Sequence, residues 1–338
     1  MNSTSPFVLF VCLAAFLIPG AASAPHADAD GPIIIRFASL APAGSGFMKV
    51  SKAWNRSVKK ETEGRVELRF YSGGSQGDER DFVRKMRAGQ MDGAGISTTG
   101  MGMVARPVLV LTAPGLLVEN DQLSRARTEL NDRFSKMFED AGFVLLNWGE
   151  AGKNRLFSTQ PFARPADLKS LRPWAWKDDP VFAELVSVIG ANPVRMGLPE
   201  VYGGLQTRMV DTVPSSAFAA VALQWYTKLK YMAKQNFSII VGGGIMTKEK
   251  FDELTEHDQR VLLNTSIRAS KANDALVRRD DAKAYAALIA RGMTEVDIAE
   301  HEAEWDAVAK KARENLVGRV YSKSLLEAVE KVAAAGAR

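Results

Sequence analysis

One pentapeptide carries the residue pattern of a serine hydrolase. Gly73–Gly77 reads Gly-Gly-Ser-Gln-Gly, which fits G-x-S-x-G, and it falls between an expected strand and an expected helix, as a nucleophile elbow does. Attack by Ser75 needs a later histidine as base, which only His257 or His301 can supply. Both histidines stand in charged helical stretches, TEHDQR and AEHEAE, which predicts solvent-facing side chains. A glycine-rich turn is the favoured interpretation, and a secreted serine hydrolase on Ser75 stays an alternative.

Cofactor and metal patterns are weaker. Gly100–Ala105 formally fits a dinucleotide fingerprint, but Pro107 prevents the long helix that must follow it. No paired histidines stand at metal-ligand spacing, and Asp178 and Asp179 are interpreted as turn residues rather than as calcium ligands. We therefore expect no metal site, no cofactor and no catalytic residue.

The composition is that of an ordinary globular protein. The 338 residues are 46% apolar and 25% charged, which is enough for two lobes and too apolar for a disordered chain. The net charge of +5 is spread along the chain among 39 acidic residues. This pattern predicts a mixed-charge surface and no nucleic-acid partner.

The first 24 residues predict export. Phe7–Ile18 is apolar and is followed by Pro-Gly and small residues, which is typical of a secretory signal peptide and too short for a membrane-spanning helix. We expect a periplasmic mature chain that begins between Ser23 and Asp30. The only cysteine, Cys12, lies in this segment, so the mature protein has no disulfide and depends on its apolar core.

Strands and helices alternate after the signal segment, which is typical of a doubly wound α/β fold. We expect strands over Ile33–Ala38, Val66–Tyr71, Phe143–Trp148 and Phe237–Val241. We expect helices over Phe47–Glu63, Asp78–Ala88, Asp121–Gly142, Ala217–Tyr226, Thr247–Leu254, Glu256–Ala290 and Glu302–Ala335.

The stretch from Asp167 to Asp211 predicts the binding site. A short strand, Arg172–Trp176, precedes a helix, Val181–Ile189, which Gly190 ends, and a second helix starts at Pro199. Two strand–helix units thus meet at one edge of a sheet. Ligands of open α/β sheets bind at the carboxyl ends of such strands.

The motifs of this stretch resemble the solute receptors of the tripartite ATP-independent periplasmic (TRAP) transporters, the DctP-like family. DLKxL, a strand, GANPxxM and PEVYxxLQxxxVD carry the resemblance. Gly64-Arg65, Gly73–Arg80, Gly89–Asp92, Pro114-Gly115 and Trp148–Arg155, which resembles the family's W-G-E-x-G-x-R step, extend it over nearly the whole mature chain.

The resemblance implies an α/β periplasmic binding protein fold with two lobes, each a mixed sheet flanked by helices, and a long helix crossing both. It assigns residues 1–24 to the signal peptide, 25–152 and 241–280 to lobe I, and 153–240 and 281–338 to lobe II. A hinge is expected near Gly242–Gly244, because glycine absorbs backbone rotation at no steric cost.

Four ligand contacts of the family can be carried over residue by residue. In the family a strand arginine, a second arginine at the start of lobe II, an aromatic residue after GANP and an asparagine clamp a carboxylate. Here Trp174 replaces the strand arginine, Leu198 replaces the aromatic residue, and Thr212–Ser215 replaces G-x-E-N. Arg155 matches the second arginine, either as a ligand contact or as an interlobe ion pair.

Arg172 shares a strand face with Trp174 and takes the clamp role if the register is shifted. Trp174 and Trp176 line the ligand site or pack in the core. The expected ligand-binding residues are Arg155, Trp174, Trp176, Leu198, Ser215 and Arg172.

The resemblance implies a receptor that captures a small molecule between two lobes, performs no chemistry and delivers the molecule to a TRAP-type membrane permease. Family members without the clamp arginine resemble a subset that handles lipophilic ligands, sometimes with a tetratricopeptide partner protein. We therefore expect an apolar or amphipathic ligand. A carboxylate ligand bound by Arg155 or Arg172 is the alternative within transport.

Overall fold

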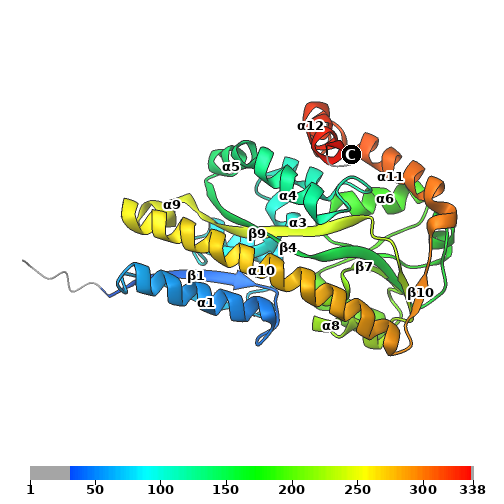
Figure 1. Cartoon of the computed structure of the whole chain (residues 1–338), viewed down its shortest axis with the longest axis horizontal. Helices are drawn as coiled ribbons and strands as arrows, with labels where there is room; N and C mark the ends of the chain where they lie inside the picture. Colours follow the sequence, from blue (N-terminus) through cyan, green and yellow to red (C-terminus); the bar gives the residue numbers. More distant parts are fainter. Residues whose placement is uncertain (1–30, 336–338) are drawn as a thin grey trace, which may run out of the picture. The chain divides into compact units, whose positions relative to one another are not determined.

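The computed structural model describes residues 31–335, which form an eight-stranded sheet and a separate two-stranded sheet (Figure 1). The large sheet has the order β10-β8-β4-β9-β3-β1-β2, and β7 pairs with β4 beside this path. Its strands are β1 (Ile33–Ser39), β2 (Val66–Tyr71), β3 (Gly93–Ser97), β4 (Phe143–Ser158), β7 (Thr212–Ser215), β8 (Tyr231–Ala233), β9 (Ser238–Thr247) and β10 (Thr294–Val296). The predicted signal peptide and Cys12 lie outside the described residues.

The first two strand–helix units are as the sequence predicts. β1 pairs in parallel with β2 on one side and with β3 on the other. Helices α1 (Gly46–Glu61) and α2 (Glu79–Arg87) connect these strands. Ser45 caps α1 by accepting from the Met48 N–H, and Asp78 begins α2 with a capping box.

Strand β4 is the longest strand and runs ten residues past its predicted end at Trp148. It pairs antiparallel with β9 along most of its length and then with β7 and β8. The polar run from Gly149 to Asn154 lacks the apolar alternation that marks a strand, so the sequence hides this extension. One register shift, between Glu150 and Lys153, lies inside this run together with Gly152, whose φ is 101°.

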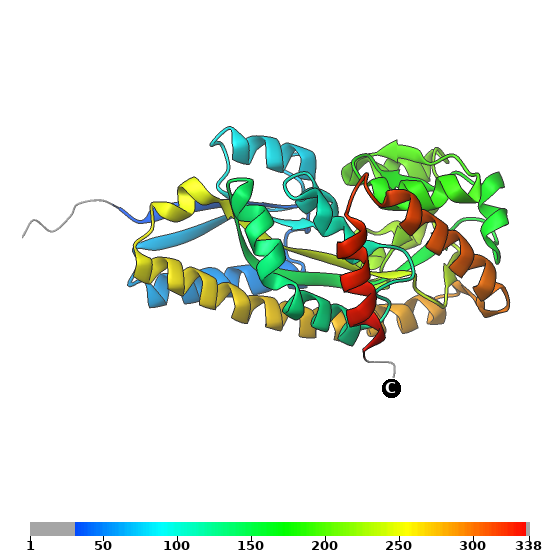
Figure 2. The ribbon, with the colours of Figure 1, turned by 90° about the horizontal axis from the view of Figure 1, so that it is seen from above.

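Helix α10 (Glu256–Ala290) has the predicted bounds and spans about 50 Å at 1.5 Å per residue. It packs on α1, β4 and α8 (Ala217–Ala222), and Figure 2 shows it passing both ends of the large sheet. Asp258 near its start pairs with Arg65, and Asp281 near its end accepts from the Lys153 and Phe218 N–H groups. The predicted two-lobed α/β fold with one long crossing helix is confirmed.

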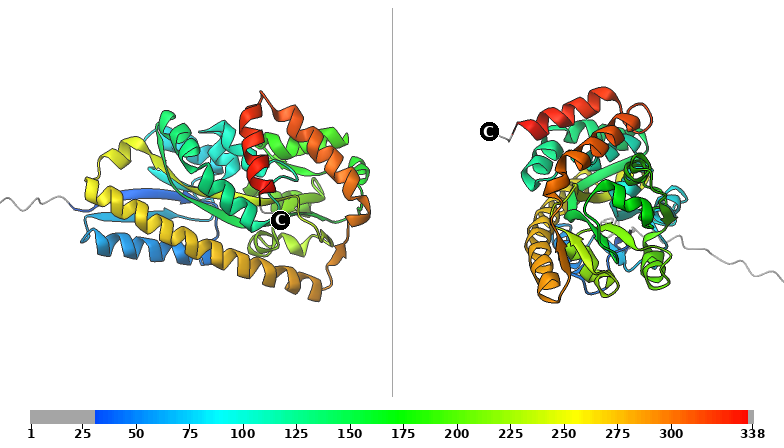
Figure 3. Two further views of the ribbon diagram at one scale, coloured as in Figure 1. Left: turned by 45° about the horizontal axis from the view of Figure 1, so that its top comes forward. Right: turned by 90° about the vertical axis from the view of Figure 1, so that its right-hand side faces the viewer.

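Three long helices of the prediction are broken in the structure. Asp121–Gly142 forms α4 (Asn120–Glu129) and α5 (Asn131–Asp140), because Leu130 leaves the helical conformation between two segments that both pack into the same apolar cluster. Glu302–Ala335 forms α11 (Glu302–Leu316) and α12 (Lys323–Ala334), separated by Gly318 with φ of 76°. Helix α8 ends at Ala222, and Gln224 follows with φ of 60°. Figure 3 shows α11 and α12 across the sheet from α10.

The stretch from Asp167 to Asp211 forms the small sheet and its helices. β5 (Trp174–Trp176) pairs in parallel with β6 (Val194–Met196), and α6 (Pro180–Ile189) connects them. Gly190 ends α6 with φ of 84°, as predicted. The second helix, α7 (Val201–Gln206), follows one turn of 3₁₀ helix that contains Pro199, and α9 (Lys248–Asp252) is the short helix before α10.

Gly242–Gly244 lie inside β9, hydrogen-bonded to β3 on one side and β4 on the other. A Cβ atom at Gly242 would lie 2.4 Å from the Ile96 carbonyl oxygen, and one at Gly243 would lie 2.3 Å from that of Asn147. The close approach of three strands is therefore sufficient to explain why these positions hold glycine. A hinge at this position and the lobe boundaries remain predictions.

Candidate functional site

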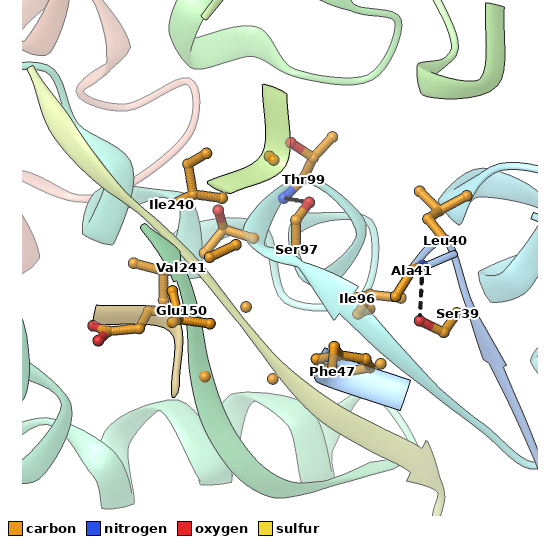
Figure 4. A pocket seen from close by; sticks show the side chains of 18 of the residues that line it. Ser39, Leu40, Ala41, Phe47, Ile96, Ser97, Thr99, Glu150, Ile240 and Val241 are labelled. Atoms are coloured by element: carbon orange, nitrogen blue, oxygen red, sulfur yellow. Dashed lines mark hydrogen bonds between the residues drawn. The ribbon is translucent and has the colours of Figure 1, made fainter. Parts of the chain in front are cut away.

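A cavity of about 340 Å³ lies where β1, β3, β4, β5 and β9 approach α1, α8 and α10. We call it the central cavity. Figure 4 shows part of its wall, with apolar side chains such as Phe47 and Ile96 beside the Ser39 and Ser97 hydroxyl groups. Both hydroxyl oxygens accept from nearby backbone N–H groups, of Ala41 and Thr99 respectively.

Aromatic side chains dominate the wall. Trp174 and Trp225 meet edge to face at 5.4 Å between ring centroids, and Trp174 lies 6.0 Å from Trp176. Such rings supply a large apolar surface of fixed geometry. The eleven aromatic lining residues are Phe37, Phe47, Trp54, Phe70, Trp148, Trp174, Trp176, Phe182, Phe218, Trp225 and Phe237.

The lining residues include no lysine, arginine or histidine, and its three acids are Glu79, Glu150 and Asp179. Asp179 caps α6 by accepting from the Val181 and Phe182 N–H groups. Burial raises its pKa, against the effect of these bonds. A negative ligand entering the central cavity thus meets no positive charge in its wall.

Glu79 is a buried carboxyl group in this wall. Its oxygens accept from the Ser97 N–H at 2.7 Å, the Ser97 hydroxyl at 2.7 Å and the Gly100 N–H at 2.9 Å. Burial raises its pKa to about 7 although these three bonds favour the charged form. The first residue of α2 is thereby fixed to the end of β3.

Four of the six predicted ligand-binding residues line the central cavity: Trp174, Trp176, Leu198 and Ser215. Trp174 is 4% exposed and donates from Nε1 to the Met196 carbonyl oxygen, so it belongs to the core as well as to the wall. Trp176 donates to Asp78 Oδ2 at 2.8 Å, which joins β5 to the start of α2.

The two predicted arginines lie elsewhere. Arg172 does not line the cavity; its Nε lies 3.3 Å from Asp211 Oδ2, and its side chain is 55% exposed. Arg155 lines a separate polar cavity of about 300 Å³ together with Lys153, Arg278, Asp281 and Tyr285. Its guanidinium group lies 3.6 Å from Asp281 and stacks over the Tyr285 ring at 4.8 Å. Neither arginine reaches the central cavity in this arrangement.

Asn154 and Asn273 are among the residues of the wall that sequence reasoning missed. The spacing W-G-E-x-G-x-R, counted from Trp148, ends at position 154, and neighbouring strand residues point to opposite faces. The spacing therefore places the family's arginine position at Asn154 and not at Arg155. Asn273 had no such signal, because it stands in the middle of a long polar helix.

Ser75 is exposed on the turn before α2. His257 Nε2 lies 3.4 Å from the Glu61 carbonyl oxygen, and His301 Nδ1 lies 3.3 Å from Glu304. Within residues 31–335, no group of three or more His, Cys, Asp or Glu side chains is placed to hold a metal ion. No helix in this part of the chain has the length and apolarity needed to cross a membrane.

Residues 37–323 match the family model described as bacterial extracellular solute-binding protein, family 7. The 2,3-diketo-L-gulonate-binding periplasmic protein of Escherichia coli is 23% identical over 285 residues, which cover 83% of this chain and 87% of the relative.

Solved structures share the fold. A TRAP periplasmic solute binding protein of Chromohalobacter salexigens with bound D-glucuronate has a TM-score of 0.83 at 21% identity, covering 88% of this chain and 99% of that one. The sugar acid binding protein of Advenella mimigardefordensis in complex with galactonate has a TM-score of 0.84 at 17% identity, covering 90% and 98%.

Proposed function

The chain belongs to family 7 of the bacterial extracellular solute-binding proteins, the DctP-like TRAP receptors, and we propose that its solute is an apolar or amphipathic molecule bound in the central cavity. The observation that carries this proposal is the wall itself, with eleven aromatic side chains and no cation. Apolar area removed from water stabilises a complex by about 25 cal/mol per Å², and aromatic rings supply much of such area.

The wall disfavours the ligands of similar proteins. Glucuronate and galactonate, which two of the solved relatives hold, are carboxylates. A carboxylate moved from water into a closed cavity loses hydration that only a hydrogen-bonded cation can replace, at a cost of several kcal/mol if none is present. Arg155 and Arg172 are the arginines that the carboxylate alternative requires, and both side chains are engaged outside the central cavity.

The test is native mass spectrometry of protein purified from the periplasm, followed by extraction of the bound molecule. The proposal expects an uncharged or amphipathic compound, released on unfolding. Recovery of a small dicarboxylate or a sugar acid would refute it.

Delivery to a TRAP-type membrane permease and residence in the periplasm follow from the family and are part of the proposal. The segment Phe7–Ile18 supports export. N-terminal sequencing of secreted protein is expected to begin between Ser23 and Asp30, whereas a sequence that begins at Met1 would show a retained segment. A tetratricopeptide partner has only the family resemblance in its support.

Capture by closure of two lobes is the proposed mode of binding, with the boundaries given above. In support, β5 and the turn after it contact the start of α2, where Trp176 donates to Asp78 and Arg80 Nε donates to Asp178 Oδ2 at 2.8 Å. Saturating ligand is expected to lower the radius of gyration in small-angle scattering through rigid-body rotation. An unchanged radius would count against closure and leave the ligand proposal standing.

A further inference from the structure

Two residues that line the central cavity each carry a buried side-chain oxygen without a recorded hydrogen-bond partner. Asn154 Oδ1 and Asn273 Oδ1 are among the few buried side-chain atoms of residues 31–335 that no hydrogen-bond partner reaches. Asn154 lines the cavity from β4, and Asn273, 6% exposed, lines it from α10. A buried acceptor without a donor is costly, so each oxygen calls for a donor that the protein does not provide.

The amide nitrogens of both residues are already engaged. Asn273 Nδ2 donates to the Glu150 carbonyl oxygen at 3.4 Å, and since a carbonyl can only accept, this contact fixes which end of the amide is nitrogen. Asn154 Nδ2 donates to Ser238 Oγ at 3.2 Å. The two oxygens are therefore the ends left for a ligand.

Other donors of the wall are largely used within the protein. Four of the five lining tryptophans donate their indole N–H to protein acceptors: Trp54, Trp148, Trp174 and Trp176. The Ser51, Thr112 and Ser270 hydroxyl groups donate to backbone carbonyls. Donors of the described wall that have no recorded acceptor, such as Asn147 Nδ2 and Trp225 Nε1, carry no charge.

We propose that the solute has an apolar body and one polar end that donates hydrogen bonds, a hydroxyl or an amino group, and that this end docks on Asn154 and Asn273. The inference rests on the proposed function, since it names the polar end of the molecule that the aromatic wall selects. An amino group meets no cation in the wall to repel it, whereas a carboxylate finds no cation to pair with and has no proton to donate to the two oxygens.

The experiment uses four probes with one skeleton: 3-phenylpropan-1-ol, 3-phenylpropylamine, 3-phenylpropionate and propylbenzene. Each is titrated into the ligand-free full-length mature protein, with tryptophan fluorescence as the readout. The alcohol and the amine are expected to bind about tenfold more tightly than propylbenzene, the difference that hydrogen bonds to buried acceptors provide. The carboxylate is expected to bind more weakly than propylbenzene.

Two variants locate the docking point. Asn273→Asp keeps the shape and an acceptor but adds a negative charge, so the amine is expected to gain about tenfold while the alcohol changes little. Asn273→Leu is expected to bring the alcohol to the level of propylbenzene. Asn264→Asp is the matched control, because Asn264 is exposed on the same helix, and it is expected to leave all four affinities unchanged.

The outcomes separate the two proposals. Equal binding of the alcohol, the amine and propylbenzene would overturn the donor end and leave the apolar receptor in place. A preference for the alcohol that survives Asn273→Leu would overturn the docking point. Tightest binding by the carboxylate, or no binding by any probe up to its solubility limit, would overturn both proposals.

Discussion

The two sides of β4 between Gly149 and Arg155 differ in the charged side chains that surround them. On one side, the central cavity has aromatic walls, two unpaired amide oxygens and no cation. On the other, Arg127, Glu150, Asp274 and Arg278 form an ion network, which we call the Glu150 network, and Arg155 pairs with Asp281. Arg127, Arg155 and Arg278 thus pair with acidic residues of α10 and β4.

Neighbouring positions on a strand can therefore line different cavities. Asn154 lines the central cavity, and Arg155 lines the polar cavity. Glu150 lines both cavities, and its side chain, 1% exposed, points its charge toward Arg278.

The largest effect is expected from Glu150→Ala. Removing this carboxylate leaves Arg127, whose side chain is 9% exposed, with only Asp274 as a partner among the described residues. Loss of one member of a buried ion network costs about 3–5 kcal/mol of unfolding free energy. Urea denaturation of the wild type and of Glu150→Ala measures this loss of unfolding free energy. Glu256→Ala, at a side chain 92% exposed, is the control and is expected to change stability by less than about 0.5 kcal/mol. Equal effects of both variants would refute the network.

A carboxyl group on the cavity side is expected to respond to pH. Because burial raises the pKa of Glu79 to about 7, the folded state binds a proton more tightly than the unfolded state does. Stability is therefore expected to fall as pH rises from about 4.5 to 7, by up to about 3 kcal/mol. The measurement is the difference between the wild type and Glu79→Gln across this range. A constant difference would contradict the prediction.

Trp174→Ala is expected to weaken an apolar ligand by about 1–3 kcal/mol, the contribution of one buried aromatic contact. The same change also lowers stability, because Trp174 packs on Trp225 in the core. Calorimetry on folded protein separates the two effects. Trp305→Ala removes a tryptophan of α11 that does not line the cavity. This variant is expected to bind the apolar ligand as tightly as the wild type does. Equal losses in both variants would point to a general loss of structure.

The smallest effect is expected from Arg172→Ala. Its side chain is 55% exposed and pairs with Asp211 at 3.3 Å, so the pair contributes less than about 1 kcal/mol. Ligand affinity is expected to stay within error of the wild type. A tenfold loss of affinity in this variant would place Arg172 at the ligand, as the shifted register requires.

The sequence predicts the fold well where local signals are strong. Capping residues mark two boundaries, Asp78 before α2 and Gly190 after α6. The long helix α10 is predictable because its sequence has few helix breakers. Leu130 breaks a helix without glycine or proline, so only tertiary packing determines that break. Of the site, Trp174 and Trp176 are predictable from motif position, but the unpaired oxygen of Asn273 depends on contacts between segments 123 residues apart.

We propose that the central cavity excludes carboxylates because its wall holds no cation. Calorimetric titration of succinate, malate, sialic acid and D-glucuronate into ligand-free wild type and into Arg155→Ala tests this claim most directly. Micromolar binding corresponds to about 8 kcal/mol, which an unpaired buried carboxylate is not expected to reach. The account predicts no measurable binding of any of the four acids to either protein. Micromolar binding of one acid to the wild type that is lost in Arg155→Ala would contradict it.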